Sequence, residues 1–169
     1  MSEAMKRGAK EGVGFGLIAG AIFVVMEVVG AAMMGQPALM PIRMFASTVL
    51  GQAALMESSA AAVLIVGTIV HFALSGVFGL IYGLINGRFS TSTETSFGRQ
   101  AGLGLLFGAM LWLANFQLIA RVLYPWFLDA PQFLQMAMHA MFFGLPLGLM
   151  YAAAERRAHH SVRHVGVGT

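Results

Sequence analysis

The chain has 169 residues, of which 58% are hydrophobic and only 10% are charged, and its formal net charge is +3. Because a soluble domain averages about 25% charged residues, this composition excludes an ordinary soluble domain and predicts an integral membrane protein. The absence of cysteine excludes disulfides, thiolate metal sites, iron–sulfur clusters and covalently attached haem.

Four apolar stretches are long enough to cross a bilayer, since a spanning helix needs roughly 20 residues. They cover about 12–35, 61–86, 101–124 and 132–154. Backbone polar groups in lipid have to be hydrogen-bonded within each segment, so we expect these stretches to be helices. The sequence therefore predicts a single all-α membrane domain over 1–169, folded as an up-down-up-down four-helix bundle.

The first stretch begins after a basic lead-in, as the apolar core of a signal peptide does. Its apolar run is longer than the about 7–15 residues of such a core, so we expect it to remain as a span. The connection after it contains Pro37 and Pro41, followed by an amphipathic pattern over about 42–55. This pattern predicts an interfacial helix on the outer surface, which would cover polar residues below it.

The positive charges predict the orientation in the membrane. Eight of the ten lie before the first span, between the second and third, or after the fourth, and Arg43 and Arg121 alone lie on the other side. The positive-inside rule then places both termini in the cytoplasm and the chain in the inner membrane. Topology and anionic lipid headgroups explain the basic excess, so we expect no nucleic-acid partner. The eight are Lys6, Arg7, Lys10, Arg88, Arg99, Arg156, Arg157 and Arg163.

The chain also reads as two related hairpins in tandem. Six residues of the first stretch match six of the third at a constant offset of 88, with Glu27 matching Asn115. His71 and Gly76 match His139 and Gly144 at an offset of 68, and a one-residue slip at Pro146 brings Gly79, Leu80 and Tyr82 onto Gly148, Leu149 and Tyr151. This repeat predicts a pseudo-twofold axis along the membrane normal.

Four polar residues inside the spans are the candidate functional residues: Glu27, His71, Asn115 and His139. Each lies 15 or 16 positions from a charged or amide residue at the cytoplasmic side of its own stretch. At 1.5 Å per residue this is about 24 Å, so the four share one layer in the outer half of a core about 30 Å thick. Polar groups at such a depth usually face a partner or a cavity.

One interpretation of this layer is a bound cofactor. His71 and His139, on diagonal helices, could ligate haem b from opposite sides, with Arg43 and Arg121 pairing with its propionates. Another is a zinc, iron or copper site formed by His71, His139, Glu27 and Asn115. Methionines in the outer half would suit copper(I), although methionine is also a common apolar gap-filler. The cofactor is therefore left open, with haem b ahead of a metal ion.

Two further interpretations need no cofactor. Intramembrane Glu and His are common relay groups, which favours small-solute or proton transport. The favoured interpretation is a non-catalytic accessory or anchoring subunit of a larger membrane complex, bound to another membrane protein or to a second copy of itself. Its polar residues would hydrogen-bond one another and fix the register of the bundle. No phosphate loop, zinc-protease helix or nucleophile elbow is present, so we expect no enzyme activity.

Overall fold

The computed structural model describes residues 3–88 and 91–165. The structure is 88% helical, with no strand in the described part of the chain. Four helices are long and apolar enough to cross a membrane: Lys6–Met33, Ala60–Asn86, Phe97–Leu123 and Gln132–His159. The prediction of an all-α fold with four long apolar helices is confirmed.

The helices are α1 (Glu3–Met33), α2 (Met40–Leu50), α3 (Ala60–Asn86), α4 (Thr91–Glu94), α5 (Phe97–Trp112), α6 (Arg121–Leu123), α7 (Gln132–Met138) and α8 (Leu145–Val165). A π-helical segment, Leu113–Ala120, joins α5 to α6, and a second, His139–Gly144, joins α7 to α8. The first long helix begins at Glu3, well before the predicted 12, and ends at Met33, and the fourth continues to Val165, beyond the predicted 154. Their ends carry Ala, Glu, Lys and Arg, which are strong helix formers outside the apolar pattern.

The hairpin of α1 and α3 is held by backbone contact along a row of glycines. The two helices run antiparallel, because Gly8, Gly12 and Gly16 of α1 meet progressively earlier residues of α3. A Cβ added to Gly16 would lie 2.8 Å from the Cα of Gly79, which leaves no room for a side chain. Small residues at four-residue spacing let two helix backbones approach in this way.

The second hairpin packs in the same way. Its contacts show where the two copies of the repeat become shifted by one residue relative to each other. A Cβ on Gly104 would meet the carbonyl oxygen of Gly144 and lie 3.3 Å from the Cα of Gly148, just as Gly16 meets Ser75 and Gly79. Gly144 therefore stands where Ser75 does, at an offset of 69, and the match of Gly144 to Gly76 is wrong. The extra residue lies in the π-helical segment before Pro146, because a π bulge accommodates one added residue in a helix.

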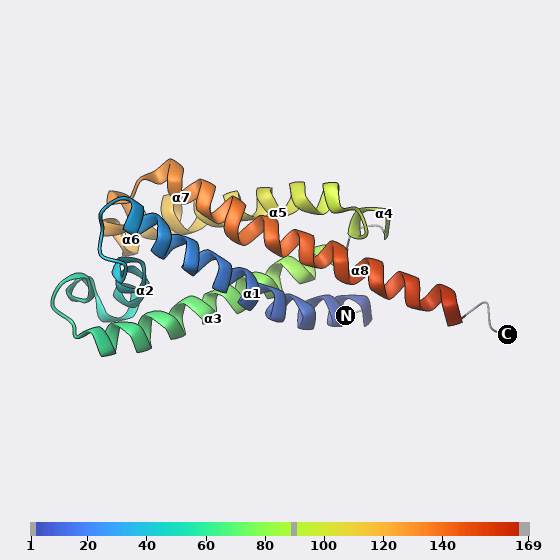
Figure 1. Cartoon of the computed structure of the whole chain (residues 1–169), viewed down its shortest axis with the longest axis horizontal. Helices are drawn as coiled ribbons and strands as arrows, with labels where there is room; N and C mark the ends of the chain where they lie inside the picture. The colour runs from blue at the N-terminus through green and yellow to red at the C-terminus, as the bar shows by residue number, and fades with distance from the viewer. Residues whose placement is uncertain (1–2, 89–90, 166–169) are drawn as a thin grey trace.

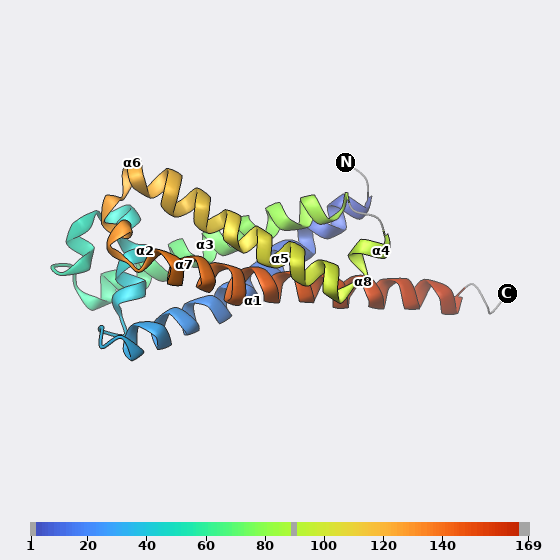
Figure 2. The same cartoon turned by 90° about the horizontal axis from the view of Figure 1, so that it is seen from above.

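Polar contacts join the two hairpins at the end of the molecule where α1 begins and α8 ends (the terminal end; Figure 1). Arg7 pairs with Glu155 at 2.6 Å, and the Tyr151 hydroxyl donates to the Gly8 carbonyl oxygen at 2.5 Å. Towards the opposite end α1 and α6 diverge (Figure 2). The bundle is therefore closed at the terminal end and spread at the other.

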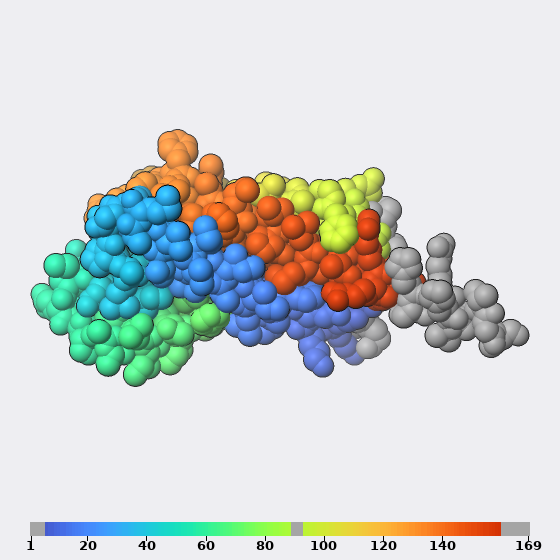
Figure 3. All heavy atoms as spheres, in the orientation of Figure 1, coloured from blue at the N-terminus to red at the C-terminus, as the bar shows by residue number. Residues whose placement is uncertain are grey.

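Helix α2 and its flanking turns cover the spread end, as the space-filling view shows (Figure 3). The predicted interfacial helix over 42–55 is shorter than expected: α2 ends at Leu50, Gly51 turns the chain with φ 74°, and a 3-10 turn follows over Gln52–Leu55. Helix α2 packs on α3, where a Cβ on Gly67 would meet the backbone of Ile42. Trp126 lies in the 3-10 turn Pro125–Asp129 between the third and fourth long helices, which the predicted orientation puts on the outer side (the second outer turn). It ties α2 to this turn by donating to the Ser47 hydroxyl at 2.9 Å.

Candidate functional site: a cavity at the spread end of the bundle

All four residues of the predicted polar layer line one cavity. Its volume is about 1020 Å³, and its walls come from α1, α2, α3, the third long helix, the second outer turn and the fourth long helix. Ligand pockets usually measure about 300–1,000 Å³, so this space accommodates an organic molecule rather than a single ion. The sequence placed Glu27, His71, Asn115 and His139 at one depth, and the structure brings them around one space.

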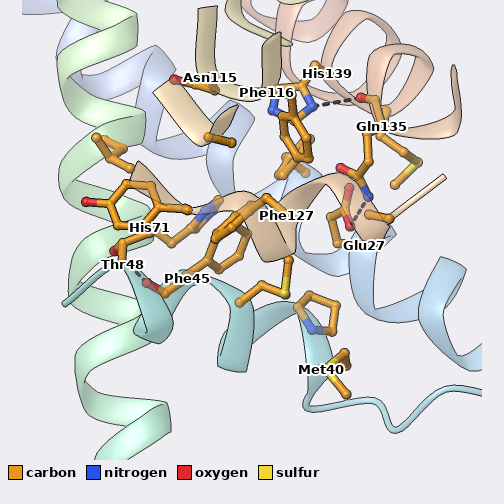
Figure 4. A pocket seen from close by; sticks show the side chains of 18 of the residues that line it. Glu27, Met40, Phe45, Thr48, His71, Asn115, Phe116, Phe127, Gln135 and His139 are labelled. Atoms are coloured by element: carbon orange, nitrogen blue, oxygen red, sulfur yellow. Dashed lines mark hydrogen bonds between the residues drawn. The ribbon is translucent and has the colours of Figure 1, made fainter. Parts of the chain in front are cut away.

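His71 forms one side of the cavity (Figure 4). It is 6% exposed, and its ring stacks on Phe45 with centroids 4.5 Å apart. Its Nε2 lies 2.9 Å from the carbonyl oxygen of Gly20. Because a carbonyl oxygen only accepts, Nε2 carries the proton. In a neutral imidazole the other nitrogen, Nδ1, is then an acceptor with no hydrogen bond to a described residue.

His139 and Glu27 form the other side and are linked through Gln135 (Figure 4). His139 Nδ1 donates to the Gln135 carbonyl oxygen at 2.7 Å, which leaves Nε2 as the acceptor of a neutral ring. The Gln135 side-chain amide donates to Glu27 Oε2 at 3.2 Å. The second carboxylate oxygen, Oε1, is buried and has no hydrogen-bond partner among the described residues.

Gln135 is the site residue that the sequence analysis missed. It lies four positions before His139 in the same helix, so the two side chains share a face. An amide inside an apolar stretch could have identified Gln135 as a candidate. It was missed because it lies one helical turn away from the layer of Glu27, His71, Asn115 and His139. It matters because it holds both Glu27 and His139 in place.

The second half of the chain contributes Asn115 and His139 from π-helical segments. Asn115 lies within Leu113–Ala120, and His139 is the first residue of His139–Gly144. Their counterparts, Glu27 and His71, lie in regular α-helix. π-helical turns widen a helix locally and often occur at functional sites. The two halves of the repeat therefore differ in helix type where they line the cavity.

The structure does not assemble the proposed haem site. Arg43 donates to the carbonyl oxygens of Ala54 and Ser58, Arg121 donates to Gln117, and neither arginine lines the cavity. The Phe23 ring packs against both imidazoles, with centroids 6.0 Å from His71 and 4.7 Å from His139. A porphyrin between the two histidines would occupy the place of that ring, so the arrangement does not fit haem b.

The polar layer also does not form a ready metal site. In the described ranges, one group of three or more His, Asp or Glu has all its ligand atoms within 4.8 Å: Glu94, Glu155 and His159. That group lies at the terminal end, where Glu155 is already paired with Arg7. Five methionines line the cavity, two of them in α2 and three in other segments, and so are scattered around its wall: Met34, Met40, Met44, Met56 and Met138.

A packed apolar layer separates the cavity from the terminal end. Ala19, Leu147 and Tyr151 are fully buried there, next to buried Phe143 and partly buried Phe78. Of these, Phe143 and Phe78 form part of the cavity wall, whereas Ala19, Leu147 and Tyr151 lie outside it. The bundle is therefore closed at the terminal end, and the cavity reaches only part of the way through it.

Comparison of the chain with known protein families, curated proteins and solved structures gives no match.

Proposed function

We propose that this protein spans the inner membrane four times, up-down-up-down, with both termini in the cytoplasm, and binds a small organic molecule in the cavity near the outer face. The four apolar helices and the distribution of basic residues support this orientation. The single observation that carries the binding function is the cavity of about 1020 Å³ on which all four intramembrane polar residues converge.

The hydrogen bonds favour ligand binding over a structural role for the polar layer. A register-fixing cluster would pair these residues with one another. Instead Glu27 bonds Gln135, and the two histidines bond backbone carbonyl oxygens. One carboxylate oxygen is left unpaired at the cavity, which costs stability unless a ligand satisfies it. The accessory-subunit interpretation, with its membrane protein partner, stays a prediction.

Transport is less well supported than binding. A path across the bilayer would have to pass the layer of fully buried Ala19, Leu147 and Tyr151, where the described helices are tightly packed. Movement of a solute would therefore need a second conformation that opens this layer. We propose a binding protein, without catalysis, as the role that the present geometry supports.

The test is to fill the cavity and measure the ligand that co-purifies with the protein. Gly30 and Thr48 both line the cavity, and a Cβ on Gly30 meets no atom within 4 Å. We expect Gly30→Phe/Thr48→Phe to lose a molecule that mass spectrometry detects in wild-type protein extracted in mild detergent. Gly14→Phe/Thr68→Phe is the matched control, because both residues are exposed and lie outside the cavity.

Equal ligand content in the two double variants would place the molecule elsewhere and contradict the proposal. A wild-type preparation with no bound organic molecule would also contradict it. An absorption spectrum of the same samples identifies haem directly. A b-type band that disappears in His71→Ala and His139→Ala would show that Phe23 moves and that the bis-histidine interpretation is right.

A further inference from the structure

We propose that the cavity selects a lipophilic cation, namely an aromatic or aliphatic amine whose protonated head is bound by Glu27. This inference rests on the proposed binding function and specifies its ligand. Three features of the cavity support it: the sign of its charge, the hydrogen-bonding groups left free in it, and the composition of its wall.

The charge of the cavity is opposite to that of the chain. The protein has ten Lys and Arg against seven Asp and Glu, yet no Lys or Arg is among the described residues that line the cavity. Its two formally charged residues are Glu27, deep in the wall, and Asp129, exposed in the second outer turn. A cleft with charge of one sign and low-dielectric walls concentrates ions of the opposite sign. The cavity therefore favours a cation and disfavours an anionic lipid or fatty acid.

Three acceptors are left free at the cavity, beside the side chains of Gln36, Asn115 and Tyr124, which can both donate and accept. Glu27 Oε1, His71 Nδ1 and His139 Nε2 have no partner among the described residues, because the donor nitrogen of each imidazole is used on a backbone carbonyl. Two donors in the wall are also used: Trp126 donates to Ser47, and Thr48 donates to Phe45. A ligand that brings N–H donors satisfies these acceptors, and an ammonium group has donors and no acceptor.

The wall suits the apolar part of such a molecule. Eight aromatic side chains line the cavity, among them Phe45, Phe127 and Trp126. Aromatic faces attract cations, and more strongly where the cation is desolvated. They also bind apolar rings by stacking and burial. A simple metal ion or a neutral lipid would use only one of these two properties.

The test compares two probes with the same body and different heads. The protonated amine 3,3-diphenylpropylamine and the neutral alcohol 3,3-diphenylpropan-1-ol are titrated calorimetrically into the full chain in phosphatidylcholine nanodiscs, with empty nanodiscs subtracted. Trp112→Phe provides a second readout, because it leaves Trp126, which lines the cavity, as the only tryptophan. Trp112 lies outside the cavity, and its indole N–H has no partner among the described residues.

At pH 8 we expect the amine to bind at least about tenfold more tightly than the alcohol, the effect of one unscreened charge pair. Glu27→Gln keeps the shape and the hydrogen bond to Gln135, and it should remove this preference. Asp129→Asn is the matched control. Its carboxylate is exposed and screened, so we expect a change of less than about threefold.

Acidification gives a second check, made on wild-type protein and on Glu27→Gln. When the pH is lowered from 8, any protonation of Glu27 removes the charge that binds the amine, so amine affinity should fall while alcohol affinity stays constant. The other titratable groups that face this space are His71, His139, Tyr124 and Asp129. Protonation of either histidine or of Asp129 would weaken amine binding in the same direction. The share due to Glu27 is the part of the pH dependence that Glu27→Gln abolishes.

The outcomes separate this inference from the binding function. If the alcohol binds as tightly as the amine in wild-type protein and Glu27→Gln changes neither, the cation inference is wrong and the binding function stands. If neither probe binds and no organic molecule co-purifies, both are wrong. If Glu27→Gln does not fold, the comparison of amine with alcohol in wild-type protein still decides the inference.

Discussion

Replacing Gly79 by alanine should separate the two helices on which the cavity is built. Gly79 lies in α3 against α1, and its added Cβ would meet the carbonyl oxygen of Gly12 and lie 2.6 Å from the Cα of Gly16. Gly76, three positions earlier, is the matched control. Its Cβ would lie 3.7 Å from Val13 and 3.9 Å from Leu17, which is ordinary contact.

The magnitude follows from these distances. Carbon atoms pack best at about 3.5–4.0 Å, so the Gly79 Cβ is roughly 0.9 Å too close to the Cα at 2.6 Å. Both contacts are backbone atoms, which cannot rotate away, so α1 and α3 must move apart. A gap of about 0.5–1 Å loses a quarter to a half of the dispersion energy of each contact. Overpacking of this kind costs about 1–3 kcal/mol, whereas Gly76→Ala gains up to about 1 kcal/mol of helix propensity.

Thermal unfolding in one detergent, followed by circular dichroism, measures the difference. For a chain of this size 1 kcal/mol corresponds to about 2–4 °C. We therefore expect Gly79→Ala to unfold about 2–12 °C below wild type, and Gly76→Ala to unfold at or above it. If Gly79→Ala is as stable as Gly76→Ala, the two backbones are not in contact and the glycine packing described here is wrong.

Two further predictions concern other parts of the fold. Ser47→Ala removes the acceptor of the Trp126 N–H. It should therefore lower the free energy of unfolding by about 0.5–1.5 kcal/mol and speed amide exchange in α2. Thr48→Ala is the control: it loses a hydrogen bond only to Phe45 in the same helix, so it should not speed exchange. At the terminal end, burial and then the nearby Glu155 raise the pKa of Glu94 above its usual 4.5, while His159 and Arg7 oppose the shift. A carboxyl with a raised pKa favours folding below pH 4.5 and loses that contribution as pH rises through its folded value. Glu94→Gln should therefore gain stability relative to wild type as the pH is raised from 4 to 8, and a constant difference between the two proteins would contradict this pKa shift.

The fold class was predictable from the sequence because long apolar helices have a strong, local signal. Four long apolar stretches predict four helices without reference to contacts. Helix ends were less predictable, since the polar turns of α1 and α8 carry no apolar pattern. The break of the 42–55 segment at Gly51 depends on one backbone angle, and the sequence offers only a glycine as its signal.

The site was predictable in part. Depth along a helix is a count of residues, so the common layer of Glu27, His71, Asn115 and His139 could be derived from sequence. The hydrogen bonds of the two histidines could not be derived from sequence, because they depend on which backbone carbonyl lies beside each ring. Gln135, which joins Glu27 to His139, was missed for the same reason. The arginines placed with haem propionates bond to loop carbonyls or to their own helix.

By itself the sequence determined the all-helical class, the four long apolar helices and the depth of the polar residues. These properties follow from composition and from the fixed rise of a helix, both of which are local. Only the tertiary structure decided that the polar residues surround a cavity rather than pair with one another. That outcome depends on where the two hairpins diverge, where π-helical turns widen the fourth helix, and how α2 covers the opening. Each of these features depends on how segments distant in sequence pack together, so the residue pattern within one segment does not predict it.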